Sequence, residues 1–285
     1  MIKFDNIKKT FRRTQVLKGL NLEISKGDRI ALVGSNGAGK TTMIRCLLGE
    51  YTYEGQVLVN GKDPREERQV VLKDIGFVPQ LPPPLKMPVG QLIEFSASLC
   101  EADPQEMIGV LERLGLNYEE LRSRPFVKLS GGQKQKILIS IALGRDAKIL
   151  ILDEPAANLD PDARHIFFQL LAEKKEDVVM LISSHRLDEV AALVNRVIEM
   201  DQGIVVLDDR VEDSVELDSI LKCEIMIKRA DEAFAKAIKA WQFESSDGLL
   251  WTGEVAGPDR LRFLGVLSRY AAILKDIHME EHSNG

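Results

Sequence analysis

The chain has 285 residues, of which 45% are hydrophobic and 29% charged, a balance typical of a globular protein large enough for two domains. Its net charge of −6 argues against a large nucleic-acid-binding surface. The three cysteines are widely spaced, which indicates reduced thiols in a cytosolic protein and neither a disulfide framework nor a CxxC metal site. No apolar run reaches the roughly 18 residues that span a bilayer, and the polar, charged N-terminal region predicts no signal peptide. We therefore expect any membrane role to depend on a partner.

The first part of the chain leads into a glycine-rich loop. Residues 2–8 and 16–24 alternate apolar and polar side chains, as half-buried antiparallel strands do, and Phe11 lies between them in a basic, turn-like stretch. A β-branched, apolar run at 29–33 predicts a buried strand. It continues directly into the loop and a predicted helix from Met43, and the loop residues are Gly34, Ser35, Asn36, Gly37, Ala38, Gly39, Lys40, Thr41 and Thr42.

A strand, a glycine-rich loop ending in Gly-Lys-Thr and a helix form the context that a phosphate-binding P-loop requires. The glycines allow positive φ, so that backbone N–H groups turn toward phosphate oxygens at the helix N-terminus. We expect Lys40 to reach the β- and γ-phosphates and Thr41 to offer its hydroxyl to Mg²⁺. The alternative is a turn whose glycines only avoid clashes, but all fixed positions of the motif are filled. The loop therefore predicts binding of a nucleoside triphosphate.

The middle of the chain predicts a helical insertion in an α/β sheet. A short buried strand at 75–78 ends near Gln80, and the proline-rich residues 81–85 are expected to be extended. From 89 to 121 the apolar spacing becomes helical, and one helical face is expected to carry Leu92, Phe95 and Leu99. We expect this helical subdomain to occupy about residues 86–145.

Two further motifs follow the insertion. Leu129 and Ser130 precede a glycine pair and Gln133, where Ser130 is a natural helix N-cap and Gly131 and Gly132 leave the first N–H groups accessible. An ordinary capped helix start and a second anion-binding site both fit this pentapeptide. The apolar strand predicted at 149–152 ends in Asp153 and Glu154. These are either two solvated acids or the pair that holds Mg²⁺ (Asp153) and orients and deprotonates the attacking water (Glu154).

The remaining chain predicts the rest of the sheet and a small second domain. A helix at 161–174, a buried strand at 178–183 and a hairpin at 197–207 imply a mostly parallel sheet with ligands at its carboxyl edge. Beyond an acidic stretch, alternating strands and helices suggest a ferredoxin-like α/β appendage. Its expected core members are Trp241, Leu250, Phe263, Leu264 and Leu267. The segment 278–282 could chelate a metal through its two histidines, but a solvated C-terminal tail is the preferred interpretation.

Taken in order, these motifs resemble the ATP-binding subunits of ABC transporters over about residues 1–210. The P-loop, the pentapeptide 129–133 and the acidic pair are joined in the family pattern by Gln80, Asn158-Leu159-Asp160 and His185. The resemblance implies an α/β fold, with an ABC-type P-loop NTPase domain at 1–212 and a small α/β domain at 213–285. The short core with its appendage resembles exporter-type subunits, including the one tied to copper-site maturation of nitrous oxide reductase.

The resemblance also implies a site and partners. Two subunits would form a homodimer around two ATP molecules with Mg²⁺, each ATP lying between the P-loop of one copy and Ser130, Gly131, Gly132 and Gln133 of the other. It assigns Phe11 to adenine stacking, Gln80 to Mg²⁺, the attacking water and the membrane partner, and His185 to the γ-phosphate. Asp160 caps a helix before Pro161 and takes a role across the dimer.

The expected function is ATP hydrolysis that drives a substrate through a separate integral-membrane permease at the cytoplasmic face of the membrane, with no nucleic-acid partner. The alternative is a soluble ABC ATPase of translation or DNA repair. Such relatives carry two cassettes or long insertions, which this chain does not show.

Overall fold

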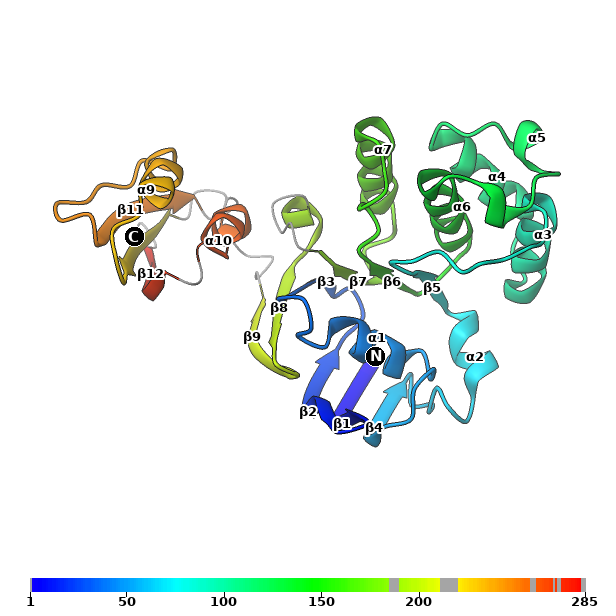
Figure 1. Ribbon diagram of the computed structural model, residues 1–285, viewed down its shortest axis with the longest axis horizontal. Coiled ribbons are helices and arrows are strands. Elements are labelled where there is room, and N and C mark those ends of the chain that lie inside the picture. Colours follow the sequence, from blue (N-terminus) through cyan, green and yellow to red (C-terminus); the bar gives the residue numbers. More distant parts are fainter. Residues whose placement is uncertain are drawn as a thin grey trace. The chain divides into compact units, whose positions relative to one another are not determined.

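The computed structural model describes residues 2–184, 190–210, 220–256, 260–268, 270 and 273–282. The chain divides into two compact units, one formed by residues 1–185 with 193–209 and the other by residues 186–192 with 210–285. No helix of the described part is long and apolar enough to span a lipid bilayer. Figure 1 labels the elements of both units, which are taken separately below.

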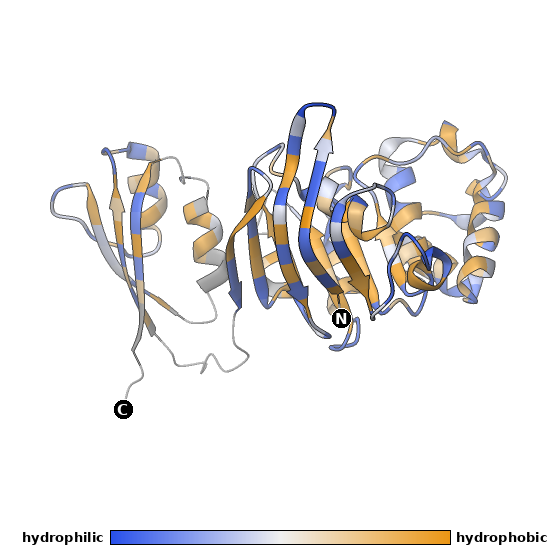
Figure 2. Cartoon of the chain, turned by 90° about the horizontal axis from the view of Figure 1, so that it is seen from below, coloured by the Kyte–Doolittle hydropathy of each residue, from blue (hydrophilic) through white to orange (hydrophobic). Residues whose placement is uncertain are grey.

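An antiparallel sheet begins the first unit. Its strands are β1 (Ile2–Phe11), β2 (Thr14–Ile24) and β4 (Glu54–Val59), in the order β2-β1-β4. The alternation expected for the first two strands is confirmed, because Ile2, Phe4 and Ile7 are buried whereas Asp5 is exposed. Figure 2 shows the resulting change of hydrophobic and hydrophilic residues along these strands.

A second sheet of six strands carries the expected parallel core. It contains β3 (Arg29–Val33), β5 (Ile75–Val78), β6 (Ile149–Asp153), β7 (Val179–Ser183), β8 (Arg196–Asp201) and β9 (Ile204–Arg210), in the order β5-β6-β7-β3-β8-β9. The first five strands in this order are mutually parallel. All residues of β6 and β7 are buried, as their uninterrupted apolar sequences require. Because these strands are parallel, the carboxyl ends of β3, β5, β6 and β7 lie at one edge of the sheet.

Helices cover the six-stranded sheet and extend it. The helix α1 (Lys40–Leu47) contacts β2, β4 and β6, and α7 (Pro161–Ala172) follows β6 in the chain. The short elements are α2 (Arg68–Lys73), η1 (Phe126–Lys128) and η2 (Ala191–Leu193). A group of four helices lies beside β5 (Figure 1) and consists of α3 (Val89–Cys100), α4 (Pro104–Arg113), α5 (Tyr118–Leu121) and α6 (Gly131–Leu143). These helices form the predicted helical insertion.

One face of α3 differs from the expectation. The buried face of this helix consists of Val89, Gly90, Leu92, Ile93 and Ala97. Phe95 and Leu99, which share a face with Leu92 in the sequence pattern, are 54% and 63% exposed. The reason is that α3 packs on α4, α5 and α6 with one side only. Its opposite side therefore carries large apolar side chains on the surface of this unit.

The second unit is built from β10 (Ile220–Ile227), α9 (Glu232–Lys239), β11 (Leu250–Ala256), α10 (Arg260–Ser268) and β12 (Leu274–His282). Its sheet is antiparallel in the order β11-β10-β12, and its own core includes Ile225, Phe234, Trp251 and Phe263. Among the described residues the sheet has three strands, one fewer than a ferredoxin-like fold contains.

Two expectations for this unit were wrong. Leu250 is 37% exposed, because the strand register turns its neighbour Trp251 into the core instead. The segment 278–282 belongs to β12 and is not an irregular tail, although His278 is exposed to solvent as expected. No group of three or more histidine, cysteine or acidic residues suited to a metal ion occurs in the described part of the chain.

The domain boundary near residue 212 is a prediction that truncation can test. The side chain of Arg196 binds Asp208 at 2.7 and 2.6 Å and Asp28 at 2.7 Å, which anchors β9 to the first unit up to this position. The second unit has a separate core. We therefore expect a chain ending at about residue 212 to fold and to bind ATP as the full chain does, measured by thermal melting and nucleotide titration. A truncated protein that is folded but no longer binds ATP would contradict this division.

Candidate functional site

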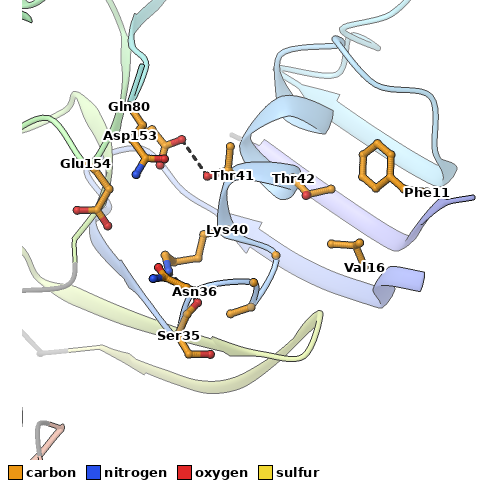
Figure 3. A pocket seen from close by; sticks show the side chains of 13 residues that line it. Phe11, Val16, Ser35, Asn36, Lys40, Thr41, Thr42, Gln80, Asp153 and Glu154 are labelled. Carbon is orange, nitrogen blue, oxygen red and sulfur yellow. Dashed lines mark hydrogen bonds between the residues drawn. The ribbon is translucent and has the colours of Figure 1, made fainter. Parts of the chain in front are cut away.

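A cavity of about 390 Å³ lies at the carboxyl edge of the six-stranded sheet. Figure 3 shows Asp153 and Glu154 at one end, Phe11 at the other and the glycine-rich loop between them. The structure thus brings together predicted residues from four separate segments. The lining residues are Phe11, Val16, Ser35, Asn36, Gly37, Ala38, Gly39, Lys40, Thr41, Thr42, Gln80, Asp153 and Glu154.

The loop conformation requires glycine. Gly34, Gly37 and Gly39 have φ values of 143°, 86° and 108°, which side chains rarely tolerate. A Cβ atom on Gly34 would lie 2.2 Å from the carbonyl oxygen of Met200. Gly39 occupies the N-cap position of α1 and offers no side-chain cap. The first N–H groups of the helix therefore face the cavity end, where an anion is stabilised.

Lys40 is held over this loop. Its Nζ atom donates hydrogen bonds to the carbonyl oxygens of Gly34 at 2.6 Å and Ser35 at 3.3 Å, and the residue is 7% exposed. Burial lowers the pKa of Lys40, whereas the charges of Glu154 and Asp153 oppose this shift and favour the ammonium form. Its hydrogen bonds to the two carbonyl oxygens hold the Lys40 side-chain nitrogen among the loop N–H donors, which suits a phosphate group.

Asp153 is fixed by two hydroxyl groups. The Oγ1 atom of Thr41 donates to its Oδ2 at 3.0 Å (Figure 3), and the Oγ atom of Ser183 donates to its Oδ1 at 2.6 Å. Ser183 Oγ also accepts a hydrogen bond from the backbone N–H of Glu154 at 2.9 Å. Sequence reasoning missed Ser183, because only the pairing of β6 with β7 places it beside the acidic pair. The one signal in the sequence that could have indicated Ser183 is its hydroxyl group at the end of the predicted buried strand.

Glu154 stands in an unusual backbone conformation. Its φ of 51° lies in the left-handed region, which costs a residue with a side chain of this kind about 1 to 3 kcal/mol. Such strain persists only where the surroundings hold it, and it is frequent at functional sites. Figure 3 shows the carboxylate of Glu154 beside Lys40 and Gln80 in the cavity. Glu154 therefore lines the same cavity as Lys40 and Gln80.

The pentapeptide 129–133 begins α6 with a capping box. Ser130 Oγ accepts from the N–H of Gln133 at 3.2 Å, and Gln133 Oε1 accepts from the N–H of Ser130 at 3.1 Å. Asp160 caps α7 by accepting from the N–H of Ala163 at 2.9 Å, and its ion pair with Lys136 and this hydrogen bond lower its pKa. None of Ser130, Gly131, Gly132, Gln133 and Asp160 lines the cavity.

His185 lies outside the described residues. Of the sequence-predicted site residues, the structure therefore gathers the P-loop, Phe11, Gln80, Asp153 and Glu154 in one cavity. The residues of the pentapeptide and Asp160 lie elsewhere on the same unit.

Phe11 is supported from behind by two residues that the sequence did not indicate. Its ring makes an edge-to-face contact with Tyr51, with the ring centroids 5.2 Å apart, and the ammonium of Lys9 lies 4.7 Å from its centroid. Tyr51 packs on the hydrophobic core of the first unit, whereas Phe11 is 39% exposed at the cavity. Tyr51 therefore restrains the ring that a purine base would stack on.

Replacing Tyr51 tests this support. We expect Tyr51→Leu to weaken ATP binding roughly 3- to 10-fold, because an aromatic pair contributes about 0.5 to 1.5 kcal/mol beyond burial. Binding of inorganic tripolyphosphate, which has no base to stack, should be unchanged in the same calorimetric titration. Tyr51→Phe keeps the ring and is the control. Equal losses for ATP and tripolyphosphate would show that Tyr51 acts on the phosphate loop instead.

Comparisons with known proteins agree with this geometry. Residues 17–157 match the family model described as ABC transporter. The phosphonates import ATP-binding protein PhnC of Wolinella succinogenes is 31% identical over 90% of this chain and 100% of its own length. The chain belongs to the ABC transporter ATP-binding proteins. A putative ABC transporter ATP-binding protein of Methanosarcina mazei is 32% identical over 74% of this ABC ATPase, which spans 38% of that relative's length.

The fold of this ABC ATPase also matches solved cassettes. A dimeric structure of a bacterial ABC transporter cassette superposes with a TM-score of 0.65 at 25% identity, and covers 74% of this chain and 98% of the cassette. The prediction of an ABC-type α/β P-loop NTPase that binds and hydrolyses ATP is thereby confirmed. The finer likeness to exporter-type and copper-maturation subunits stays a prediction.

Proposed function

We propose that this ABC ATPase hydrolyses Mg²⁺-ATP in the cavity between the P-loop and Glu154. The observation that carries this proposal is the meeting of Lys40, the Thr41–Asp153 pair and Glu154 around one space. The donor set fits Mg²⁺, since a hydroxyl and a carboxylate already share a hydrogen bond and the amide of Gln80 lines the same cavity. Thr41, Asp153 and Gln80 would hold the ion, which supplies charge neutralisation of the β- and γ-phosphate oxygens.

The residues of the cavity have different roles in ATP hydrolysis. The loop N–H groups and Lys40 bind and orient the β- and γ-phosphates, and Phe11 stacks on the adenine ring. Glu154 orients a water molecule toward the γ-phosphorus and accepts its proton. Ser183 supports both acids, because one hydroxyl group bonds the Asp153 carboxylate and the Glu154 N–H.

Removal of Mg²⁺ with a chelator is expected to stop phosphate release, and added Mg²⁺ to restore it.

A second copy of the chain supplies the missing groups. Ser130, Gly131, Gly132 and Gln133 lie on the same unit but outside the cavity lining, and the accessible start of α6 can accept a phosphate from another molecule. We assign to the homodimer two such composite sites, with Asp160 across the interface and His185 at the γ-phosphate. The dimeric cassette with the matching fold supports this arrangement.

A groove on the first unit suits the permease. It has a volume of about 840 Å³ and lies where α2, β5, α3 and α6 meet. Val70 and Leu99 are 51% and 63% exposed in its wall, and basic residues outnumber the single acidic one in the lining, namely Arg68, Lys73 and Arg145 against Glu50. An apolar floor with basic residues fits a short amphipathic permease helix with acidic groups. We therefore place the chain at the cytoplasmic face of the membrane, held there by its permease.

The groove is linked to the nucleotide through β5. Phe77 of this strand lines the groove, and Gln80 lines the ATP cavity only three residues later. A displacement of β5 by a docked helix would thus move Gln80 relative to Asp153. This direct connection provides a route from permease contact to the chemistry.

Two valines allow a matched test of the groove. Val70 in the groove and Val206 on β9 are both 51% exposed, so that aspartate at either position should leave folding intact. We expect Val70→Asp, but not Val206→Asp, to reduce the amount of the chain retained on washed membranes of its own cells, measured by immunoblotting. Equal retention of both variants would place the permease contact elsewhere.

A further inference from the structure

Helix α6 holds the carbonyl group of Pro155, the residue that directly follows Glu154. Gln135 lies in the second turn of this helix, is fully buried and has its Nε2 atom 3.1 Å from the carbonyl oxygen of Pro155. Because a carbonyl oxygen only accepts hydrogen bonds, the amide nitrogen of Gln135 is the donor. The contact joins two segments 20 residues apart in the chain.

The same helix holds the rest of this segment. The ammonium of Lys136 lies 2.8 Å from Oδ2 of Asp160. Gly132 approaches the segment so closely that a Cβ atom there would lie 3.0 Å from the carbonyl oxygen of Asn158. The first two turns of α6 therefore contact the beginning, middle and end of residues 155–160.

Gln135 is energetically unfavourable at a core position. Its Oε1 atom is buried and has no hydrogen-bond partner within the described part of the chain. A buried polar atom without a partner opposes folding, so an apolar side chain of the same length would pack there at lower cost. Packing alone thus does not account for the amide, whereas the hydrogen bond to Pro155 does.

The hydrogen bond from Gln135 to Pro155 lies next to Glu154, a residue with a strained backbone. Glu154 has a φ of 51°, and its N–H is held by Ser183 on one side. On the other side, the carbonyl of Pro155, one peptide beyond the Glu154–Pro155 bond, is held by Gln135. Because the proline ring fixes the φ angle of Pro155, a hold on its carbonyl also restrains the Glu154–Pro155 peptide. The two contacts on either side of Glu154 thus restrain the direction in which its side chain leaves the backbone.

We propose that Gln135 is a positioning residue for Glu154 and ties the catalytic carboxylate to helix α6. The inference rests on the proposed role of Glu154 as the proton acceptor. Since Ser130 is the N-cap of α6, the helix assigned to the nucleotide of the partner copy also positions the base of its own site. Engagement of one site in the dimer would therefore align the carboxylate of the other.

Gln135→Met provides the test, because methionine has a similar length, favours helices and lacks the donor. We expect kcat for ATP to fall about 10- to 100-fold, as a small misplacement of a reacting group can cause. KM and the affinity for ATP should change less than twofold, and Tm should not decrease. Hydrogen exchange of residues 156–159 should become faster.

The matched control is Ser140→Ala, another fully buried polar residue of α6, whose hydroxyl donates a hydrogen bond to the carbonyl of Ile137 in its own helix. It should leave kcat unchanged. Rates are normalised to the fraction of protein that binds nucleotide, so that partial misfolding does not obscure the result. Gln135→Leu is measured as a second variant. Full kcat in folded Gln135→Met or Gln135→Leu would overturn the inference. A wild-type chain without ATPase activity would instead refute the proposed function.

Discussion

Glu154→Gln is expected to bind ATP with unchanged affinity and to hydrolyse it at least about 100-fold more slowly, the usual contribution of a general base. The amide preserves the size of the side chain and leaves the Ser183 contact with the backbone N–H in place. It cannot accept the proton of the attacking water. The hydrogen bonds of Lys40 with the loop carbonyls and of Thr41 with Asp153 do not involve this side chain, so the phosphate cradle remains.

Lys40→Ala is the complementary variant. It removes the ammonium that lies against the carbonyl oxygens of Gly34 and Ser35 and therefore the main positive charge of the loop. We expect ATP affinity itself to be lost. Calorimetric titration and phosphate release should be measured for both variants. If Glu154→Gln and Lys40→Ala lose affinity equally, the assignment of one residue to catalysis and the other to binding is wrong.

The local motifs of the site were predictable because each is fixed by consecutive residues. The P-loop needs glycines at set positions between a strand and a helix, and the strand ends of a parallel sheet meet at one edge. The cavity accordingly contains Lys40, Thr41, Asp153 and Glu154 together. The family pattern added Phe11 and Gln80, which local spacing alone did not identify.

The supporting contacts could not be predicted, because they join segments whose neighbours are decided by tertiary structure. Ser183 reaches Asp153 only through the pairing of β6 and β7, and Tyr51 reaches Phe11 across 40 residues. Gln135 resembles any polar helix residue until its partner, the Pro155 carbonyl, is known. Such contacts leave no periodic signal in the sequence.

Which apolar side chains are exposed could also not be predicted from the sequence. Helical spacing placed Leu92, Phe95 and Leu99 on one side of a helix, but periodicity does not reveal how many neighbours a helix has. Only the packing of α3 shows that Phe95 and Leu99 remain exposed. Similarly, Leu250 and Trp251 are both apolar, and the register of β11 with β10 decides which of them is buried.

The largest expected structural response is dimerisation on ATP. Glu154→Gln should be monomeric without nucleotide and dimeric with ATP, because the phosphates then lie between the P-loop of one copy and the start of α6 of the other. Slow hydrolysis keeps this state long enough for measurement by light scattering. The response should disappear in a Lys40→Ala/Glu154→Gln double variant, which cannot hold the nucleotide.

Ser130→Arg in the Glu154→Gln background tests the other half of the interface. Ser130 is exposed at the first turn of α6, and a long cationic side chain there would fill the space needed by the facing phosphates. The serine also caps the helix, so Ser130→Ala, which removes the cap for about 1 kcal/mol without adding bulk, is the control. We expect Ser130→Ala to dimerise with ATP and Ser130→Arg to stay monomeric. The measurement is repeated on the chain bound to its permease, which holds two copies close together. A chain that remains monomeric with ATP in both settings, or a Ser130→Arg chain that dimerises like Ser130→Ala, would contradict a composite site, because the start of α6 would then not face the bound nucleotide.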